Sequence, residues 1–230
     1  MTDFWTDTVF FGGVISLLGY EVGLLLKKRF RLAILNPLLI AVCCVIAVNK
    51  LLGVDYETYN QGGQYLSYLL TPATVCLAVP LYRQLSLLKR NWKAIICGLT
   101  AGIVAGAVGI LALAKLFGLT HEQYVTLLPK SVTTAIGMGI SQELGGLVAI
   151  TTATIVITGI LGNVLAEAVF KLFRIHHPVA RGLALGNAAH AIGTAKAMEL
   201  GEVEGAMSSL AIAVAGILTV VSASVFAPLL

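Results

Sequence analysis

The sequence predicts an all-α polytopic membrane protein, with about six full transmembrane helices, two broken or re-entrant segments and an inverted repeat in its C-terminal half. Of the 230 residues, 58% are hydrophobic and only 11% are charged, and the mean hydropathy is +0.93. A soluble domain has about 25% charged residues, so this chain has too little polar surface to cover a water-soluble globule. Apolar segments of about 20 residues, the length that a helix needs to cross a bilayer, recur along the chain.

Four apolar segments fill the first half of the chain. The N-terminal sequence MTDFWTD is acidic and lacks the basic start of a cleavable signal peptide, so we expect the first segment to remain in the mature protein. We expect residues 1–118 to form a four-helix half that acts as a scaffold and makes oligomer contacts. Residues 119–230 are expected to form a repeat half that carries the functional site. The four predicted helices span residues 8–26, 34–52, 65–82 and 94–117.

The basic residues indicate the orientation of the chain in the membrane. Eleven of the fifteen Lys and Arg residues form three clusters, each after an apolar segment. Because cytoplasmic loops are rich in Lys and Arg, we place these clusters inside the cell and the N-terminus outside. No basic face with interleaved aromatic residues is present, so nucleic acid is not an expected partner. The clusters are Lys27, Lys28, Arg29 and Arg31, then Arg83, Lys89, Arg90 and Lys93, then Lys171, Arg174 and Arg181.

The third apolar segment, residues 65–82, contains Pro72 and Pro80. Each proline removes a backbone donor and kinks or breaks a helix. In lipid the freed carbonyl groups need new partners, so we expect these breaks inside the protein or beside a hydrated cavity.

The fourth apolar segment carries a doubled GxxxG pattern at Gly98, Gly102 and Gly106. Such a face allows close contact between helices. Packing within one chain is the simpler interpretation, and a contact between two copies is the alternative. We also expect a homo-oligomer.

No pattern indicates a metal centre, a cofactor or an enzyme. The sequence contains no nucleophile elbow, HExxH helix, Walker loop or dinucleotide fingerprint. The cysteines lie in apolar segments without metal-ligand spacing or nearby His, so we interpret them as small core residues. They are Cys43, Cys44, Cys76 and Cys97.

The second half of the chain repeats itself. The sequence AIGMGISQELG, from Ala135, matches AIGTAKAMELG, which begins 56 positions later at Ala191. Each copy is a polar, Gly-rich broken segment followed by an apolar helix, over residues 147–170 or 205–229. If the broken segments dip into the membrane and return, the two copies have opposite topology; if they span it, the copies are parallel. The positive-inside pattern favours the inverted arrangement, which recurs in transporters.

Lys130 lies in the first broken segment, LLPKSVTTAIGMGISQELGG, directly after Pro129, which we expect to break the helix. An ionised Lys at the bilayer centre costs about 2.5–3.5 kcal/mol, so it normally faces a cavity or a partner. The functional interpretation is a positive charge that receives a small anion. The alternative is a lysine near the outer interface that reaches the lipid headgroups.

Three hydroxyl residues follow Lys130, at Ser131, Thr133 and Thr134. At a helix start after Pro129, free backbone N–H groups and the helix dipole would bind a carboxylate. Hydroxyls in membrane helices also commonly donate to carbonyl groups of the preceding turn, which is the structural alternative.

The second broken segment contains Asn187, His190 and Thr194, and Thr134 aligns with His190. In a continuous helix Asn187, His190 and Thr194 would share one face, as polar residues around a hydrated site do. The unperturbed pKa of a histidine is about 6.5, so His190 could carry a coupling proton; a hydrogen bond between helices is the alternative.

Two glutamates occupy the same position in the two copies of the repeat, Glu143 and Glu199. We consider them as proton carriers, as ion-pair partners of Lys130 and Lys196, or as residues at the membrane rim.

The longest motifs resemble the LrgB/CidB family of bacterial membrane proteins, and the likeness covers nearly the whole chain. One departure is Ala135, where the family pattern tends to have Pro, which weakens the expected break after Thr134. The motifs are NPLLIA at 36–41, PATVCLAVPLY at 72–82, LLPKSVTTAIGMGIS at 127–141 and GLALGNAAHAIGTAKAMELG at 182–201.

The resemblance implies a multi-pass protein of the bacterial inner (cytoplasmic) membrane and two functions. One is transport of small monocarboxylates of the glycolate, glycerate, pyruvate or lactate type, for which the repeat predicts alternating access and His190 or a glutamate would carry any coupling proton. The other is antiholin-like control of murein hydrolase activity and lysis, with a small LrgA/CidA-type membrane partner. A lysine beside hydroxyls in an inverted repeat favours the carrier of a small organic anion. In that interpretation Lys130 and the hydroxyls of residues 131–134 face Asn187, His190 and Thr194 across the substrate.

Overall fold

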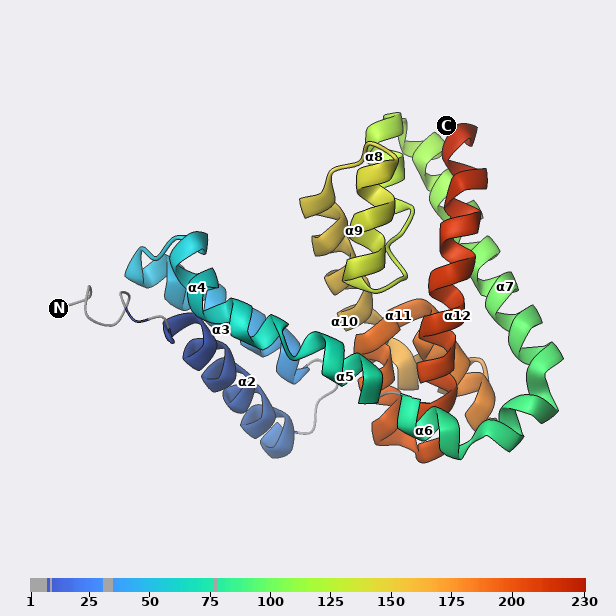
Figure 1. Ribbon diagram of the computed structural model, residues 1–230, viewed down its shortest axis with the longest axis horizontal. Helices are drawn as coiled ribbons and strands as arrows, with labels where there is room; N and C mark the ends of the chain where they lie inside the picture. Colours follow the sequence, from blue (N-terminus) through green and yellow to red (C-terminus); the bar gives the residue numbers. More distant parts are fainter. Residues whose placement is uncertain (1–7, 9, 31–34, 77) are drawn as a thin grey trace. The chain divides into compact units, whose positions relative to one another are not determined.

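The computed structural model describes residue 8 and residues 10–30, 35–76 and 78–230, and every regular element in these ranges is helical. The chain forms two compact units, Met1–Cys76 and Leu77–Leu230. Figure 1 shows the helices of each unit.

The first unit contains α2 (Phe11–Phe30), α3 (Pro37–Leu52), α4 (Tyr56–Ser67) and α5 (Leu70–Cys76). Helix α2 packs against α3 and α4 through glycines. A Cβ atom on Gly23 would lie 2.6 Å from the Pro37 carbonyl oxygen, so only glycine allows this approach of α2 to α3.

The segment at 65–82 does not form one helix. Instead α4 ends at Ser67, α5 spans Leu70–Cys76 and α6 spans Ala78–Arg83. Pro72 and Pro80 are each the third residue of one of these short helices. Prolines are tolerated there because the first N–H groups of a helix have no partner within the helix.

The second unit contains three long helices, α7 (Leu85–Phe117), α10 (Val148–Leu172) and α12 (Glu202–Phe226). Among the described residues, the helices that are long and apolar enough to cross a membrane lie in α7, α10 and α12. Helix α3 is apolar but shorter. The described chain is therefore an all-α protein with membrane-type helices, and the expected count of about six spans remains a prediction. Helix α7, expected in the N-terminal half, packs against α8, α11 and α12. The remaining elements are α8 (His121–Leu127), α9 (Thr134–Glu143), α11 (Pro178–Leu200) and the 3-10 helix η1 (Ala227–Leu229).

A buried tyrosine hydroxyl links two helices in the core of the second unit. Tyr124 of α8 is fully buried in an apolar cluster contributed by α7, α8, α9 and α12. Its hydroxyl donates to the Phe226 carbonyl at 2.9 Å, which ties α8 to the end of α12.

Three of the four cysteines, Cys43, Cys76 and Cys97, are exposed, so the expectation that all are core residues is wrong.

Helix α11 is a hairpin of two half-helices rather than one rod. His190 has φ 42° and ψ −132°, which reverses the chain. After it, Ile192 accepts a hydrogen bond from Asn163 of α10 at 3.1 Å, and one turn later the Lys196 ammonium lies 2.6 Å from Glu167. These contacts advance in the same direction along both helices, so residues 191–200 run parallel to α10 and return toward the end where α11 begins.

Helices α8 and α9 form the corresponding hairpin in the first copy of the repeat. Gly146, just after α9, lies against the α8 residue Thr126: a Cβ on Gly146 would be 3.0 Å from the Thr126 backbone nitrogen. Because each hairpin returns to its starting end, successive long helices α7, α10 and α12 run in alternating directions (Figure 1).

Candidate functional site

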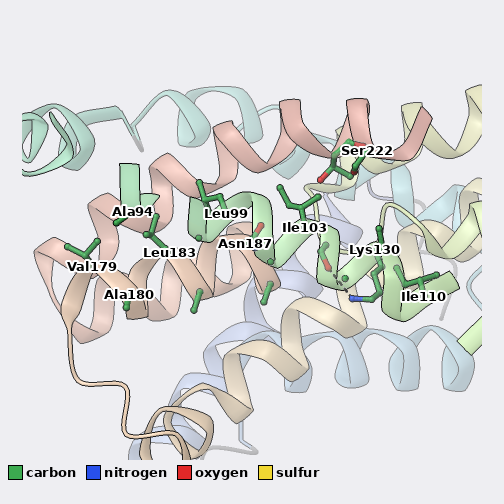
Figure 2. A pocket seen from close by; sticks show the side chains of 18 of the residues that line it. Ala94, Leu99, Ile103, Ile110, Lys130, Val179, Ala180, Leu183, Asn187 and Ser222 are labelled. Atoms are coloured by element: carbon green, nitrogen blue, oxygen red, sulfur yellow. Dashed lines mark hydrogen bonds between the residues drawn. The ribbon is translucent and has the colours of Figure 1, made fainter. Parts of the chain in front are cut away.

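A cavity of about 730 Å³ lies within the second unit, between α7, α11, α12 and the turn after α8. This volume is within the roughly 300–1,000 Å³ of small-molecule pockets. Figure 2 shows Lys130, Ser222 and Ile110 toward one end of the cavity, and Ala94 and Val179 toward the other.

Lys130 lies where the chain leaves helical geometry. Helix α8 ends at Leu127 and α9 begins at Thr134, so Lys130 occupies the turn at the tip of the hairpin. Its ammonium group donates to Ser131 Oγ at 3.0 Å and forms no ion pair with the residues that the structure describes. The cavity therefore holds an ammonium group with no carboxylate partner from the described chain.

Asn187 lines the same cavity from α11. Its Oδ1 atom is buried and has no hydrogen-bond partner among the described residues. A buried amide oxygen without a partner is costly, so a water molecule or a ligand group is expected to bind it. Lys130, Ser131 and Asn187 are the predicted site residues that the structure brings together.

The glycine face of α7 lines this cavity. A Cβ on Gly102 would collide with Asn187 Nδ2, whereas Cβ atoms on Gly98 and Gly106 would meet nothing within 4 Å. The close-contact interpretation therefore applies to Gly102, and the other two glycines leave space in the cavity.

His190 and Thr194 lie outside the lining, and the common face expected for Asn187, His190 and Thr194 is not formed. His190 Nε2 is 3.0 Å from the Ile155 carbonyl oxygen of α10. The Thr194 hydroxyl donates to the His190 carbonyl at 3.0 Å and lies 2.7 Å from Ser208 Oγ of α12. The reason is the reversal at His190, which turns the following residues away from the face that carries Asn187.

The remaining predicted residues also lie outside the lining. Thr133 is the N-cap of α9, without a side-chain capping bond, and Thr134 is its first residue. Glu143 is exposed at the end of α9.

Glu199 lies 3.6 Å from the Lys196 ammonium, in agreement with the interpretation of Glu199 as an ion-pair partner of Lys196. The nearer carboxylate is Glu167 of α10, at 2.6 Å. This group of three charges joins the second half of α11 to α10.

Sequence reasoning missed the contribution of α12. Thr219 and Ser222 line the cavity and come from the segment GILTVVSAS, where hydroxyls three residues apart share a helix face. That spacing was the available signal. Thr219 is 8% exposed.

A second cavity, of about 370 Å³, adjoins the same turn. It shares Lys130 and Ser131 with the first cavity, but its α10 lining is mainly apolar, including Leu161 and Leu165.

Comparison with known proteins places these features in a family context. The model of the LrgB-like family matches residues 16–229. Antiholin-like protein LrgB from Bacillus mycoides (strain KBAB4), and the proteins of that name from Bacillus cereus (strain B4264) and Bacillus anthracis (strain CDC 684 / NRRL 3495), are each 39% identical to this chain over 224 residues. The aligned region covers 97% of this chain and 97% of each relative. No solved structure matches the chain.

Proposed function

The chain belongs to the LrgB-like family, and from this premise we propose that it transports small monocarboxylates, of the glycolate, glycerate, pyruvate or lactate type, by alternating access. The observation that carries the proposal is the Lys130 ammonium, which lines the cavity of about 730 Å³ and has no ion-pair partner in the described chain. A desolvated ammonium is expensive unless an anion neutralises it. A carboxylate that accepts from Lys130 and Ser131 supplies that anion.

Basic residues lie at the end of the cavity that is remote from Lys130. The cavity extends from Lys130 to Asn91, near the start of α7, and to His177, just before α11. Since α10 ends where α11 begins, the basic clusters at residues 89–93 and 171–181 lie at this same end. Clustered positive charge raises the local concentration of anions. By the positive-inside pattern we propose that this end is cytoplasmic.

Two reciprocal contacts support the inverted repeat. Gly159 of α10 packs against Ile192 of α11, and Gly216 of α12 packs against Ile136 of α9; in both pairs a glycine Cβ would lie 2.7 Å from the isoleucine Cδ1. The isoleucines occupy aligned positions of the repeat, and so do the glycines. Such crossed pairs are what a two-fold relationship between two units produces.

An inverted relationship requires α10 and α12 to run in opposite directions, as they do (Figure 1), which supports the proposal. We therefore propose hairpin–helix units, α8–α9–α10 and α11–α12, that rearrange around Lys130 during transport.

Proton coupling belongs to the proposal, with His190, Glu143 and Glu199 as the candidate carriers. His190 stands at the reversal of α11, where a change in its protonation would alter the bond to Ile155. Uptake of the acid with protons should acidify the lumen of a proteoliposome, whereas uptake without a change in pH would exclude coupling.

The second candidate function is antiholin-like regulation of murein hydrolase activity with a small LrgA/CidA-type partner. The names of the relatives favour it. We further propose a location in the bacterial inner membrane with the N-terminus outside, and assembly as a homo-oligomer. Uptake assays with purified protein, alone and beside Lys130→Gln, separate the two functions, because a regulator that acts by assembly does not need the ammonium group.

A further inference from the structure

Thr219 is a buried residue of the cavity lining, and its hydroxyl has no hydrogen-bond partner among the described residues. The side chain is more than nine-tenths buried and lines the cavity that Lys130 also lines. Most membrane-helix hydroxyls in this unit donate to carbonyls of their own helix, as Thr152 and Thr154 do at 3.0 and 2.8 Å. Thr219 makes no side-chain hydrogen bond to the residues that the structure describes, so its hydroxyl is available to a ligand.

Ser222 lies one turn further along α12 and lines the same cavity. Its hydroxyl donates to the Thr219 carbonyl at 3.1 Å. Figure 2 shows Ser222 and Lys130 at the same end of the cavity, on different elements. A small acid bound to Lys130 through its carboxylate thus has hydroxyl groups of α12 on another side.

The second cavity has apolar residues at the positions that correspond to Thr219 and Ser222. Counted through the aligned GIL segments, Thr219 corresponds to Gly162 and Ser222 to Leu165, and both of these line the second cavity. Lys130 and Ser131 line both cavities, whereas Asn187, Thr219 and Ser222 line only the first, and the α10 hydroxyl of the second cavity is that of Thr158.

We propose that Thr219 is a specificity-determining residue that binds the oxygen on carbon 2 of the substrate, while Lys130 binds the carboxylate. The inference rests on the proposed transport function and deepens it. A hydroxyl group both donates and accepts, so Thr219 serves a 2-hydroxy acid as acceptor or donor and a 2-keto acid as donor. A plain fatty acid of the same size leaves the Thr219 hydroxyl unpaired in a desolvated site. The site therefore selects 2-oxygenated acids over fatty acids.

The test uses lactate and propionate, which differ only in the hydroxyl group on carbon 2. Uptake of labelled lactate into proteoliposomes that contain the full chain is inhibited with each unlabelled acid. The wild-type protein should bind lactate at least about tenfold more tightly than propionate, because one hydrogen bond in a desolvated site is at stake. Thr219→Val should weaken lactate inhibition about tenfold and leave propionate inhibition unchanged.

Two further variants complete the experiment. Thr219→Ser keeps a hydroxyl and should keep most of the preference, whereas Thr154→Val removes a hydroxyl that bonds to its own helix and should change nothing. An unchanged lactate-to-propionate ratio in Thr219→Val overturns the inference, and so does an equal loss for both acids. If the wild-type protein neither takes up lactate nor binds either acid, the proposed function fails and the inference fails with it.

Discussion

Gly193 lies against the backbone carbonyl of Leu185, eight residues before it in the same helix. In a straight helix residues eight apart are about 12 Å apart, so this contact exists only because α11 folds back at His190. Gly137 stands in the same relation to Pro129, where a Cβ would be 3.3 Å from the carbonyl oxygen. Both pairs occupy aligned positions of the repeat, so the same glycine closes both hairpins.

Replacement of Gly193 by Ala should destabilise the protein. The new Cβ would collide with the Leu185 carbonyl and lie 2.7 Å from the Ala189 Cβ, and overpacking of this kind costs about 1–3 kcal/mol. Thermal unfolding in detergent measures the effect. Gly139→Ala is the control, since its Cβ would meet nothing within 4 Å; equal melting temperatures would contradict the hairpin contact.

Replacement of Thr151 by Val should also lower the melting temperature. The Thr151 hydroxyl is buried and lies 2.8 Å from the Thr126 carbonyl and 2.7 Å from Ser141 Oγ, so it joins α10 to α8 and α9. Its removal leaves buried partners unpaired, at a cost of about 1–3 kcal/mol. Thr152→Val, which loses a bond within one helix, should cost less. A lower melting temperature for Thr152→Val than for Thr151→Val would contradict this role of the Thr151 hydroxyl.

The charge group at Lys196 should contribute more stability than the exposed pair at Arg83. The Lys196 side chain is 15% exposed and holds two carboxylates, whereas Arg83 and Glu202 are more than half exposed and 4.0 Å apart. Exposed ion pairs contribute about 0–1 kcal/mol. Lys196→Gln should therefore lower the melting temperature more than Arg83→Gln, and a larger effect of Arg83→Gln would refute the ranking.

A larger side chain on the glycine face of α7 should block transport without unfolding the protein. Gly106 lines the cavity, Gly109 does not, and a Cβ on either meets nothing within 4 Å. Gly106→Val should reduce uptake severalfold through lost cavity space, and Gly109→Val should not. Similar uptake by both variants would show that this cavity is not the substrate path.

Part of this architecture could be predicted from the sequence because it follows from hydrophobic length. The apolar segments predicted at 94–117, 147–170 and 205–229 correspond to the long helices of the second unit, α7, α10 and α12, the last continued by η1. The prolines at 65–82 indicated helix breaks, and the segment is divided among α4, α5 and α6. The positions of the breaks depend on how the freed backbone groups are satisfied, which composition does not show.

The site could be predicted from the sequence only in part. Pro129 marks the tip of the first hairpin, and Lys130 and Asn187 do line one cavity. The second hairpin turns at His190, a residue type that gives no sign of a reversal, so the directions of His190 and Thr194 could not be derived from helical periodicity. Thr219 and Ser222 were missed because hydroxyls in an apolar helix usually bond to their own backbone.

The central claim, that Lys130 binds a carboxylate in transit, is tested most directly by uptake of labelled glycolate and pyruvate into proteoliposomes that contain the chain alone. Lys115→Gln, at the last turn of α7, is the charge-matched control. We predict saturable uptake by the wild-type protein and by Lys115→Gln, and a loss of at least about a hundredfold in Lys130→Gln, since a charged contact in a desolvated site is removed. Equal uptake by wild-type and Lys130→Gln, or no uptake by the wild-type protein even with a small LrgA/CidA-type partner, would contradict the claim.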